Sequence, residues 1–359
     1  MKKRVVVGMS GGVDSSVAAY LLKEEGYEVI GVTMQIWQDE DEQTMQSNGG
    51  CCGLSAVEDA RRVAQQLDIP YYVMNFKQDF RRKVIDYFVD EYQEGRTPNP
   101  CIACNRYVKW ESLLQRSLEI GADYIATGHY ARVAQLENGR YTIANSVTAE
   151  KDQTYALYNL TQEQLSRTLM PVGNYRKDEI RGIARSIGLR IANKPDSQDI
   201  CFVPDGDYAA FLEDYTGQPS VHGSFVTADG TVLGEHKGIT HYTIGQRRGL
   251  GIPAGRRVFV TEIRPQSNEV VVGANEDLFR TVVHADHLNF MSIPDLTEER
   301  EVIAKIRYNH KGAKARVRKI GDDLVECTFY EKQRAMTPGQ ALVLYEKEHV
   351  LGGGTIIRG

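Results

Sequence analysis

Long apolar runs are absent from this 359-residue sequence, and none approaches the roughly 20 residues that a membrane-spanning helix requires. The first predicted strand starts at Arg4, which leaves no room ahead of it for a signal or transit peptide. We therefore expect a cytoplasmic protein, of bacterial type, with no membrane partner. The composition, 42% hydrophobic and 25% charged, is that of a globular chain, and the length suggests two or three domains.

Cysteine is scarce, with six residues, and a permanent disulfide framework is not expected in a cytoplasmic protein. Cys101 and Cys104 have a spacing found in zinc sites, but a structural zinc site usually needs a second pair of that kind. The other close pair, Cys51-Cys52, is adjacent and poorly spaced for chelation. Zinc is therefore disfavoured, and Cys51, Cys52 and Cys327 are interpreted as small buried or loop residues.

Basic charge is not in excess, because the formal net charge is −5, which by itself argues mildly against a nucleic-acid partner. Positive charge is concentrated locally in a basic strip, residues 305–319, which contains seven Lys or Arg and no Asp or Glu. Such a strip fits an RNA-binding surface, and it fits a solvated edge of a β-domain equally well.

The P-loop signature Gly-Lys-Ser/Thr is absent, and so is a dinucleotide-binding Gly-x-Gly-x-x-Gly with its ribose-binding acid. The sequence has instead Ser10-Gly11-Gly12-Val13-Asp14-Ser15, between a predicted buried strand and a predicted helix. A glycine pair there lets backbone N–H groups approach an anion, and the helix N-terminus adds partial positive charge. The loop predicts a phosphate site, and the alternative is a glycine-rich turn without a ligand.

Strand and helix patterns alternate through the first two hundred residues, which predicts a Rossmann-like parallel sheet of the α/β class. The predicted strands are Arg4–Met9, Tyr27–Met34, Tyr71–Asn75 and Tyr124–Thr127. The predicted helices are Ser15–Glu25, Ser55–Leu67, Asp79–Tyr92, Lys109–Ile120, Thr161–Thr168 and Arg176–Ile187. Ser10, Met34 and Gly128 lie at or just past strand ends, where ligands bind in such sheets.

Composition changes near residue 205. Short glycine-rich segments after that point predict a small α+β central domain, and alternation from about residue 278 predicts a C-terminal antiparallel β-barrel. We expect domains at 1–205, 206–276 and 277–359. Residues 38–53 are expected to form a mobile loop that orders when a ligand binds.

Two prolines, Pro98 and Pro100, stiffen the approach to Cys101 and Cys104. We expect both cysteines to lie just before a helix that starts near Lys109, and a thiol near a helix N-terminus is a competent nucleophile because its pKa is lowered.

Two other polar segments are candidates for chemistry. Cys201 follows the polar run 196–199, and Lys151-Asp152-Gln153 leads into a predicted helix, although each also fits an ordinary turn. An iron–sulfur cluster on Cys101, Cys104 and Cys201, with one iron left open to carry sulfide, is a minority alternative.

Several blocks, in the same order along the chain, resemble the tRNA-specific 2-thiouridylases (MnmA type) of the pyrophosphate-loop ATP pyrophosphatase superfamily. These blocks are Gly8–Ser15, Gly95–Pro100 with Cys104-Asn105, Gly128-His129-Tyr130, Lys151-Asp152-Gln153, Asp196–Phe202, Gly245–Gly251, Thr337–Gln340 and Leu351–Gly354. The resemblance covers essentially the full chain, and it implies a tRNA-uridine 2-sulfurtransferase whose first domain is an ATP pyrophosphatase.

The resemblance implies that the O2 oxygen of the wobble uridine is adenylated while ATP is split to AMP and pyrophosphate, with Asp14 helping to hold Mg²⁺. The implied ATP-binding residues are Gly8, Met9, Ser10, Gly11, Gly12, Val13, Asp14, Ser15, Met34 and Gly128. The implied tRNA contacts are Asn99, Pro100, Cys101, His129, Lys151, Asp152, Gln153, Arg307, Tyr308 and Gln340.

The resemblance also implies how sulfur reaches the base. Cys201 would carry a persulfide received from a sulfur-relay protein or a cysteine desulfurase, and Cys104 matches the family's nucleophile. A transient Cys104–Cys201 disulfide would then be reduced before the next turnover. The implied substrates are the tRNAs for lysine, glutamate and glutamine, and a monomer is expected on the tRNA.

One position departs from the family pattern, because Cys101 stands where many members carry Asp. A thiol with an unperturbed pKa of about 8.5 is a weak general acid or base, so the proton transfer stays unassigned and the iron–sulfur alternative gains weight. Two other classes of protein fit the sequence less well. An amidating ATP pyrophosphatase would need an ammonia-supplying block that is not present, and a non-catalytic RNA-binding protein has no reason to keep Ser10, Asp14 and Ser15.

Overall fold

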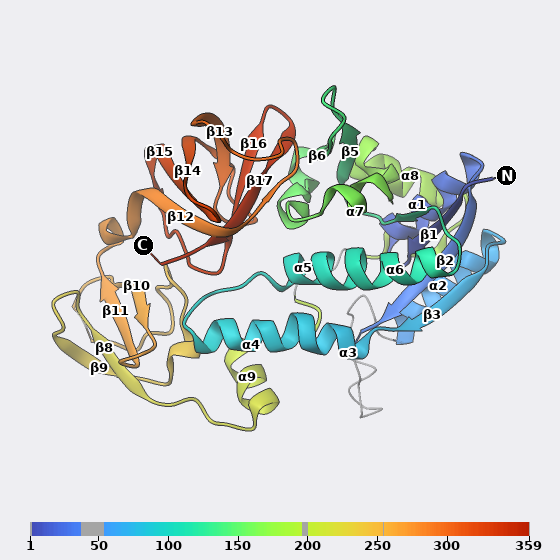
Figure 1. Ribbon diagram of the computed structural model, residues 1–359. Coiled ribbons are helices and arrows are strands. Elements are labelled where there is room, and N and C mark those ends of the chain that lie inside the picture. Colours follow the sequence, from blue (N-terminus) through green and yellow to red (C-terminus); the bar gives the residue numbers. More distant parts are fainter. Residues whose placement is uncertain (1, 37–53, 196–199, 254, 359) are drawn as a thin grey trace.

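The computed structural model describes residues 2–36, 54–195, 200–253 and 255–358 (Figure 1). The predicted loop 38–53, Cys51, Cys52 and the polar run 196–199 lie outside these ranges. None of the helices within the ranges combines the length and apolar character needed to span a bilayer.

A five-stranded sheet forms the core of the N-terminal part, and every neighbouring pair in it is parallel. Its strands, in spatial order, are β3 (Tyr71–Asn75), β2 (Glu28–Gln35), β1 (Arg4–Gly8), β4 (Tyr124–Ala126) and β7 (Thr168–Leu169). The predicted Rossmann-like α/β class is confirmed, and the four predicted strands lie within one residue of the observed ones.

Successive residues of β1 face opposite sides of the sheet, and so they enter two different apolar clusters. Val5 and Val7 pack with residues of α1 (Val13–Glu24), α2 (Leu54–Gln66) and α8 (Lys177–Ser186). Val6 packs on the other side, with two long helical columns. Helices therefore cover both faces, as the buried run in β1 requires.

The two columns run side by side in Figure 1. One consists of α3 (Lys77–Phe80), a π-helical turn (Arg81–Ile85) and α4 (Asp86–Gln93), and the other of α5 (Pro100–Ala103), a π-helical stretch (Cys104–Leu113) and α6 (Leu114–Glu119). The helix predicted at Lys109–Ile120 thus begins at Pro100, and the prediction that both cysteines precede it is wrong.

The physical reason for the early start is visible at Asn99 and Pro100. The Asn99 side-chain oxygen accepts the N–H of Cys101 at 3.1 Å, which caps the helix, and Pro100 occupies the first helical position, where no N–H is needed. The Asn-Pro pair was therefore the sequence signal for this start.

A hairpin that sequence patterns did not predict, β5 (Ala131–Gln135) and β6 (Tyr141–Asn145), leaves the first domain and pairs through Ala144 with the last strand of the chain. Shorter helical segments are α7 (Gln162–Ser166), Ala149–Lys151, Thr154–Leu157, Pro171–Asn174, Arg190–Asn193, Ile239–His241 and Asn275–Leu278.

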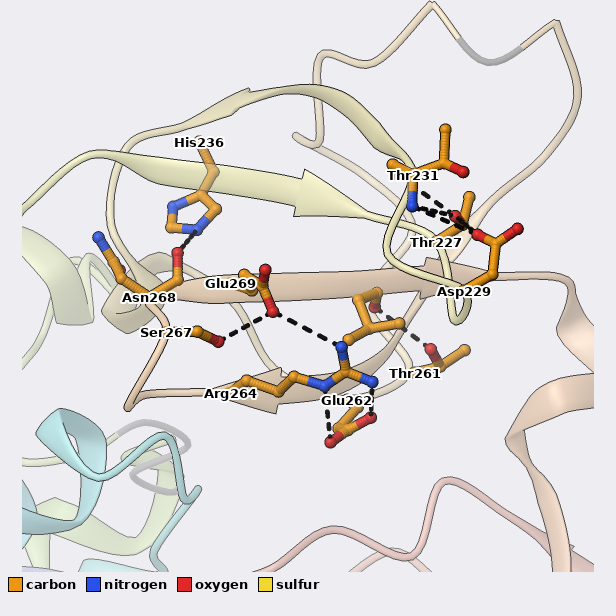
Figure 2. Close-up of polar contacts among 11 residues, drawn as sticks. Thr227, Asp229, Thr231, His236, Thr261, Glu262, Arg264, Ser267, Asn268 and Glu269 are labelled. Carbon is orange, nitrogen blue, oxygen red and sulfur yellow. Dashed lines mark hydrogen bonds and ion pairs between the residues drawn. The ribbon is translucent and has the colours of Figure 1, made fainter.

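The central part consists of α9 (Tyr208–Thr216) and a four-stranded sheet, as the α+β prediction requires. Its strand order is β10 (Phe259–Arg264), β11 (Glu269–Gly273), β8 (Gly223–Val226) and β9 (Val232–His236). Figure 2 shows Arg264 held between Glu262, at 3.1 Å, and Glu269, at 3.5 Å, so the charge of this guanidinium is compensated within the sheet.

The C-terminal part is a closed antiparallel barrel, which confirms the third predicted architecture. Its six strands are β12 (Phe279–Phe290), β15 (Leu324–Arg334), β14 (Ala313–Gly321), β13 (Arg300–Lys305), β16 (Ala341–Glu346) and β17 (His349–Ile356), and β12 pairs with β17 to close the ring. The domain boundaries at 205/206 and 276/277 stay a prediction.

Candidate active site

The loop between β1 and α1 leaves the N-terminus of the helix open. Gly12 occupies the cap position with extended backbone, and no side chain caps the helix. The first N–H groups of α1 therefore lack intrahelical partners and are available to an anion. The hydroxyls of Ser10 and Ser15 lie 3.3 Å apart beside them, and Ser16 donates to the Gly12 carbonyl at 2.8 Å.

Two glycines let neighbouring backbone close around this loop. Gly11 has φ +67°, and a Cβ at this position would lie 2.3 Å from the carbonyl oxygen of Ala56 in α2. Gly128 follows β4, and a Cβ there would lie 2.5 Å from the backbone nitrogen of Ser15. The predicted nucleotide residues Gly8–Ser15 and Gly128 are therefore in contact. Met34 lies half-buried on β2, next but one to β4 in the sheet.

Asp14 is held by two residues that sequence reasoning missed. Lys177, at the start of α8, places its Nζ 2.8 Å from both carboxylate oxygens, and the Tyr130 hydroxyl donates to Oδ1 at 2.7 Å. Lys194 also reaches the loop, donating to the Gly11 carbonyl at 3.2 Å while pairing with Asp59 at 2.8 Å. Lys177 lies 163 residues from Asp14, and no local pattern indicates the pair.

A line of contacts runs from this loop to the helix that begins at Pro100 and carries Cys101 and Cys104, here named the cysteine helix. His129 follows Gly128, its Nδ1 lies 2.8 Å from the Thr127 hydroxyl, and its Nε2 lies 3.5 Å from Lys109 Nζ. Lys109 Nζ also donates to the Asn105 side-chain oxygen at 2.9 Å, and Asn105 is the neighbour of Cys104. Burial, together with the charge of Lys109, holds the pKa of His129 well below its ordinary value.

His129 is therefore neutral, and its tautomer follows from its partners. A protonated Lys109 has no lone pair, so Nε2 accepts from it and the ring proton sits on Nδ1, which donates to Thr127. These two contacts hold the imidazole in one orientation between the loop that joins β1 to α1 and the cysteine helix.

Cys104 and Cys201 belong to segments that share one apolar cluster. Cys104 is half-buried and follows Ile102 and Ala103 into this cluster, whereas Cys101, one helical turn earlier, is exposed. Cys201 is also exposed, and its neighbour Phe202 is buried in the same cluster.

Phe202 fixes the Cys201 segment by packing against the first helical column. Its ring lies 5.3 Å from the ring of Phe88 and 5.7 Å from that of Phe80, both in edge-on geometry. Cys327, by contrast, lies in the barrel core, where burial raises the pKa of its thiol to about 12. This confirms its interpretation as a buried residue.

The described residues offer few ligands for a metal ion. In the described ranges no three His, Cys, Asp or Glu side chains are grouped so that they could hold a metal ion. The three thiols of Cys101, Cys104 and Cys201 are therefore not placed to share an iron–sulfur cluster in this structure. Mg²⁺ needs fewer protein ligands when phosphates supply the others, and Asp14 fits that role if the metal displaces Lys177.

Several predicted tRNA contacts are engaged in fixing loops. The Asp152 carboxylate accepts the N–H groups of Ser146, at 2.9 Å, and Thr154, at 3.2 Å. Gln153 accepts the N–H of Tyr130 at 2.8 Å. These residues set the backbone beside His129, while Lys151 is exposed.

The remaining predicted contacts gather near the start of the cysteine helix. Gln340 donates to the Thr97 carbonyl at 2.7 Å, which ties the barrel to the segment before Asn99. Tyr308 is 42% exposed, but desolvation raises the pKa of its phenol, and the nearby charges of Asp152 and Cys101 add to the rise. The fold thus brings Cys101, Asp152 and Tyr308 into one neighbourhood.

The basic strip separates into two parts. Arg316, Arg318 and Lys319 are paired with acids at 3.4, 2.8 and 2.9 Å, and so this part is a solvated edge of the barrel. Arg307, at the other end, forms no ion pair within the described ranges and donates to the Arg334 carbonyl at 2.9 Å. The paired part therefore fits the solvated-edge interpretation, and the RNA-binding interpretation of the strip stays a prediction for the part around Arg307.

A parallel sheet with an open, glycine-lined helix N-terminus after its first strand defines a Rossmann-like domain of the α/β class with a candidate anion site. Family models agree: residues 3–205 match the tRNA methyl transferase HUP domain, 209–274 the tRNA methyl transferase PRC-barrel domain, and 280–356 the aminomethyltransferase β-barrel domain.

Curated relatives specify the family further. The tRNA-specific 2-thiouridylase MnmA of Lachnoclostridium phytofermentans is 68% identical over 356 residues, covering 99% of this chain and 100% of the relative. That of Clostridioides difficile is 55% identical over 357 residues, covering 99% and 98%. The chain belongs to the tRNA-specific 2-thiouridylase family, which confirms the resemblance.

Solved structures add little. A 4-thiouridine synthetase–RNA complex with bound ATP aligns with 20% identity and a TM-score of 0.34, covering 60% of this chain and 50% of that chain. A score this low carries no argument about function.

Proposed function

We propose that this protein catalyses ATP-dependent 2-thiolation of the wobble uridine in the tRNAs for lysine, glutamate and glutamine. The observation that carries the proposal is the line of contacts from the loop to the cysteine helix, through Gly128, His129, Lys109 and Asn105. It joins a site that fits a polyphosphate to a thiol suited to sulfur transfer. The names of the curated relatives support the same reaction.

The first half of the reaction would use Gly8–Ser15. The open N–H groups of α1 would bind phosphate oxygens of ATP, and the adenine would lie near Met34 and Gly128. The uridine O2 attacks the α-phosphorus, forming an adenylated base and releasing pyrophosphate. Asp14 would hold Mg²⁺, and the displaced Lys177 would then face the phosphate charge.

The second half would use the cysteine pair. Cys201 receives a sulfur atom as a persulfide from a sulfur-relay protein or a cysteine desulfurase. Cys104 thiolate attacks Sγ of Cys201 and forms the Cys104–Cys201 disulfide, and the outer sulfur leaves as hydrosulfide with the electron pair of the broken S–S bond. Hydrosulfide attacks C2 of the base and expels AMP, and a cellular thiol reductant then reduces the disulfide.

Neutral His129 would sit beside the base without adding positive charge to the adenylated intermediate. Cys101 keeps no assigned role in proton transfer. Tyr308, with Asp152 and Lys151, would line the RNA side of the site. We further propose that the protein acts in the cytoplasm as a monomer on its tRNA.

The descriptions of two family models speak of methyl transfer, but the site favours thiolation. Transfer of a methyl group requires neither an anion-accepting loop nor two cysteine segments held on one apolar cluster. An amidating reaction likewise leaves Cys104 and Cys201 without a role.

The test uses anaerobically purified protein with ATP, Mg²⁺, a persulfide donor and unmodified tRNA, without free sulfide, and 2-thiouridine is measured by mass spectrometry after digestion. We expect thiolation by the wild type and its loss in Cys104→Ala, Cys201→Ala and Asp14→Asn. Cys327→Ala, which removes a thiol from the barrel core, is the matched control and should retain activity.

The side products separate the remaining alternatives. Cleavage of ATP to AMP and pyrophosphate without 2-thiouridine would contradict the substrate assignment and leave the loop assignment standing. Stoichiometric iron in the active sample would contradict the persulfide route. Unchanged cellular function of Asp14→Asn, with intact tRNA binding, would favour a non-catalytic RNA-binding protein.

A further inference from the structure

A small cavity of about 240 Å³ lies where the three parts of the chain meet. The segment before the cysteine helix contributes Thr97, the central part contributes Gly245, and the barrel contributes Arg307, Arg334, Thr337 and Gln340. Each group of residues is distant from the others in sequence, so the cavity exists only in the assembled fold.

Two guanidinium groups line this junction cavity, and neither has an acidic partner among the residues that the structure describes. Arg307 donates to the Arg334 carbonyl at 2.9 Å, and Arg334 donates to the side-chain oxygen of Asn275 and the carbonyl of Gly245, both at 3.2 Å. All these acceptors are neutral, and no Asp or Glu is among the residues that line the cavity. Arg264, between two glutamates in Figure 2, shows the opposite arrangement.

The two charges repel each other. The pKa of Arg307 is lowered, first by burial and then by the charge of Arg334, which means that the fold holds these cations together at a cost. An anion between them would remove that cost and use guanidinium N–H groups that are suited to phosphate. Thr97, Thr243 and Thr337 also line this space, and the Thr337 hydroxyl donates to the Ala335 carbonyl at 3.1 Å.

Size and position indicate what kind of anion fits. The volume is below the roughly 300–1,000 Å³ of typical small-molecule sites, so a single anionic group fits better than a whole nucleotide. Gln340 binds the carbonyl of Thr97, two residues before the cap of the cysteine helix, and Arg307 adjoins the exposed Tyr308. The cavity therefore borders the RNA side of the proposed active site.

We propose that the junction cavity binds one backbone phosphate of the tRNA through Arg307 and Arg334, and that Arg334 is an RNA-contact residue. The proposal rests on the proposed function for the identity of the RNA. It adds a residue outside the implied tRNA contacts and assigns the barrel a defined part in positioning the anticodon arm.

The test compares binding of unmodified tRNA by the wild type, Arg334→Gln and the control Arg264→Gln over a series of salt concentrations. Both substitutions remove one positive charge, but the charge of Arg264 is already compensated. The logarithm of the association constant falls as the logarithm of the salt concentration rises. Loss of one phosphate contact should make this negative slope shallower by about 0.9 and should weaken binding roughly tenfold at low salt. Arg264→Gln should leave both quantities as in the wild type.

Arg307→Gln is the second test variant, because Arg334 also donates to the Gly245 carbonyl, and a shifted melting curve of Arg334→Gln would report local loosening of the fold. Arg307→Gln should reproduce the change in slope with an unchanged melting temperature. Wild-type affinity and slope in Arg334→Gln, or an equal loss in Arg264→Gln, would overturn the proposal. Inorganic phosphate that stabilises the wild type but not Arg334→Gln, with equal tRNA affinity, would assign the cavity to a free anion and overturn it as well.

A failure of the proposed function gives a different result. In that case the wild type itself would not bind tRNA in preference to an unrelated RNA of equal length, before any variant is compared.

Discussion

Gly128→Ala tests whether the nucleotide loop depends on close backbone packing. A Cβ at position 128 would lie 2.5 Å from the nitrogen of Ser15, 2.7 Å from the carbonyl carbon of Asp14 and 2.9 Å from the Cα of Ser15. All three atoms are backbone atoms in the first turn of α1. No side chain can move aside to relieve the contact, so β4 and α1 must separate or the loop must shift.

Overpacking of this kind typically costs about 1–3 kcal/mol. If the strain is relieved by displacing the loop, that energy is lost from ATP binding, and the affinity should fall roughly 5- to 150-fold, since about 1.4 kcal/mol corresponds to a factor of ten. If the loop keeps its position, the same energy is lost from the free energy of unfolding. The free energy lost from ATP binding and the free energy lost from unfolding should together equal the strain energy of the substitution.

Titration calorimetry with ATP and Mg²⁺, together with urea unfolding, measures both parts. Gly182→Ala in α8 is the matched control, because a Cβ there meets nothing within 4 Å. It should leave ATP binding unchanged and stabilise the helix by up to about 1 kcal/mol. Wild-type ATP affinity and an unchanged urea midpoint in Gly128→Ala would refute the packing argument.

Two further predictions concern the cysteine helix and its neighbour. Asn99→Ala should lower the free energy of unfolding by about 1 kcal/mol, because the N–H of Cys101 loses its cap. Asn99→Asp should keep most of the stability, since a carboxylate oxygen can also accept this N–H. Equal urea midpoints for Asn99→Ala and the wild type would contradict the capping role. The pKa of His129 is lowered on folding, so the neutral imidazole contributes fully to the free energy of unfolding above the unfolded pKa of about 6.5. This contribution is lost as the pH falls toward the folded pKa, at up to about 1.4 kcal/mol per pH unit. His129→Gln should flatten the decline in stability between pH 6.5 and 5 by that amount, and an unchanged slope would show that His129 is not the group responsible.

The sequence by itself determined the elements whose signals are local. The buried run before Gly8, the glycine pair and the helix that follows predicted an anion-accepting turn, because strand pleat and helix N-terminus each follow from a few neighbouring residues. The true start of the cysteine helix was equally local, in Asn99-Pro100, although the prediction placed it later.

Only the tertiary structure decided which side chains meet. Lys177 binds Asp14 across 163 residues, and the β5–β6 hairpin joins a barrel whose strands come last in the chain. The basic strip contained paired and unpaired cations with the same local pattern, and only the fold showed that Arg307 faces Arg334 instead of an acid. Such contacts depend on how the sheets and helices pack, and a chain pattern with a period of a few residues carries no information about them.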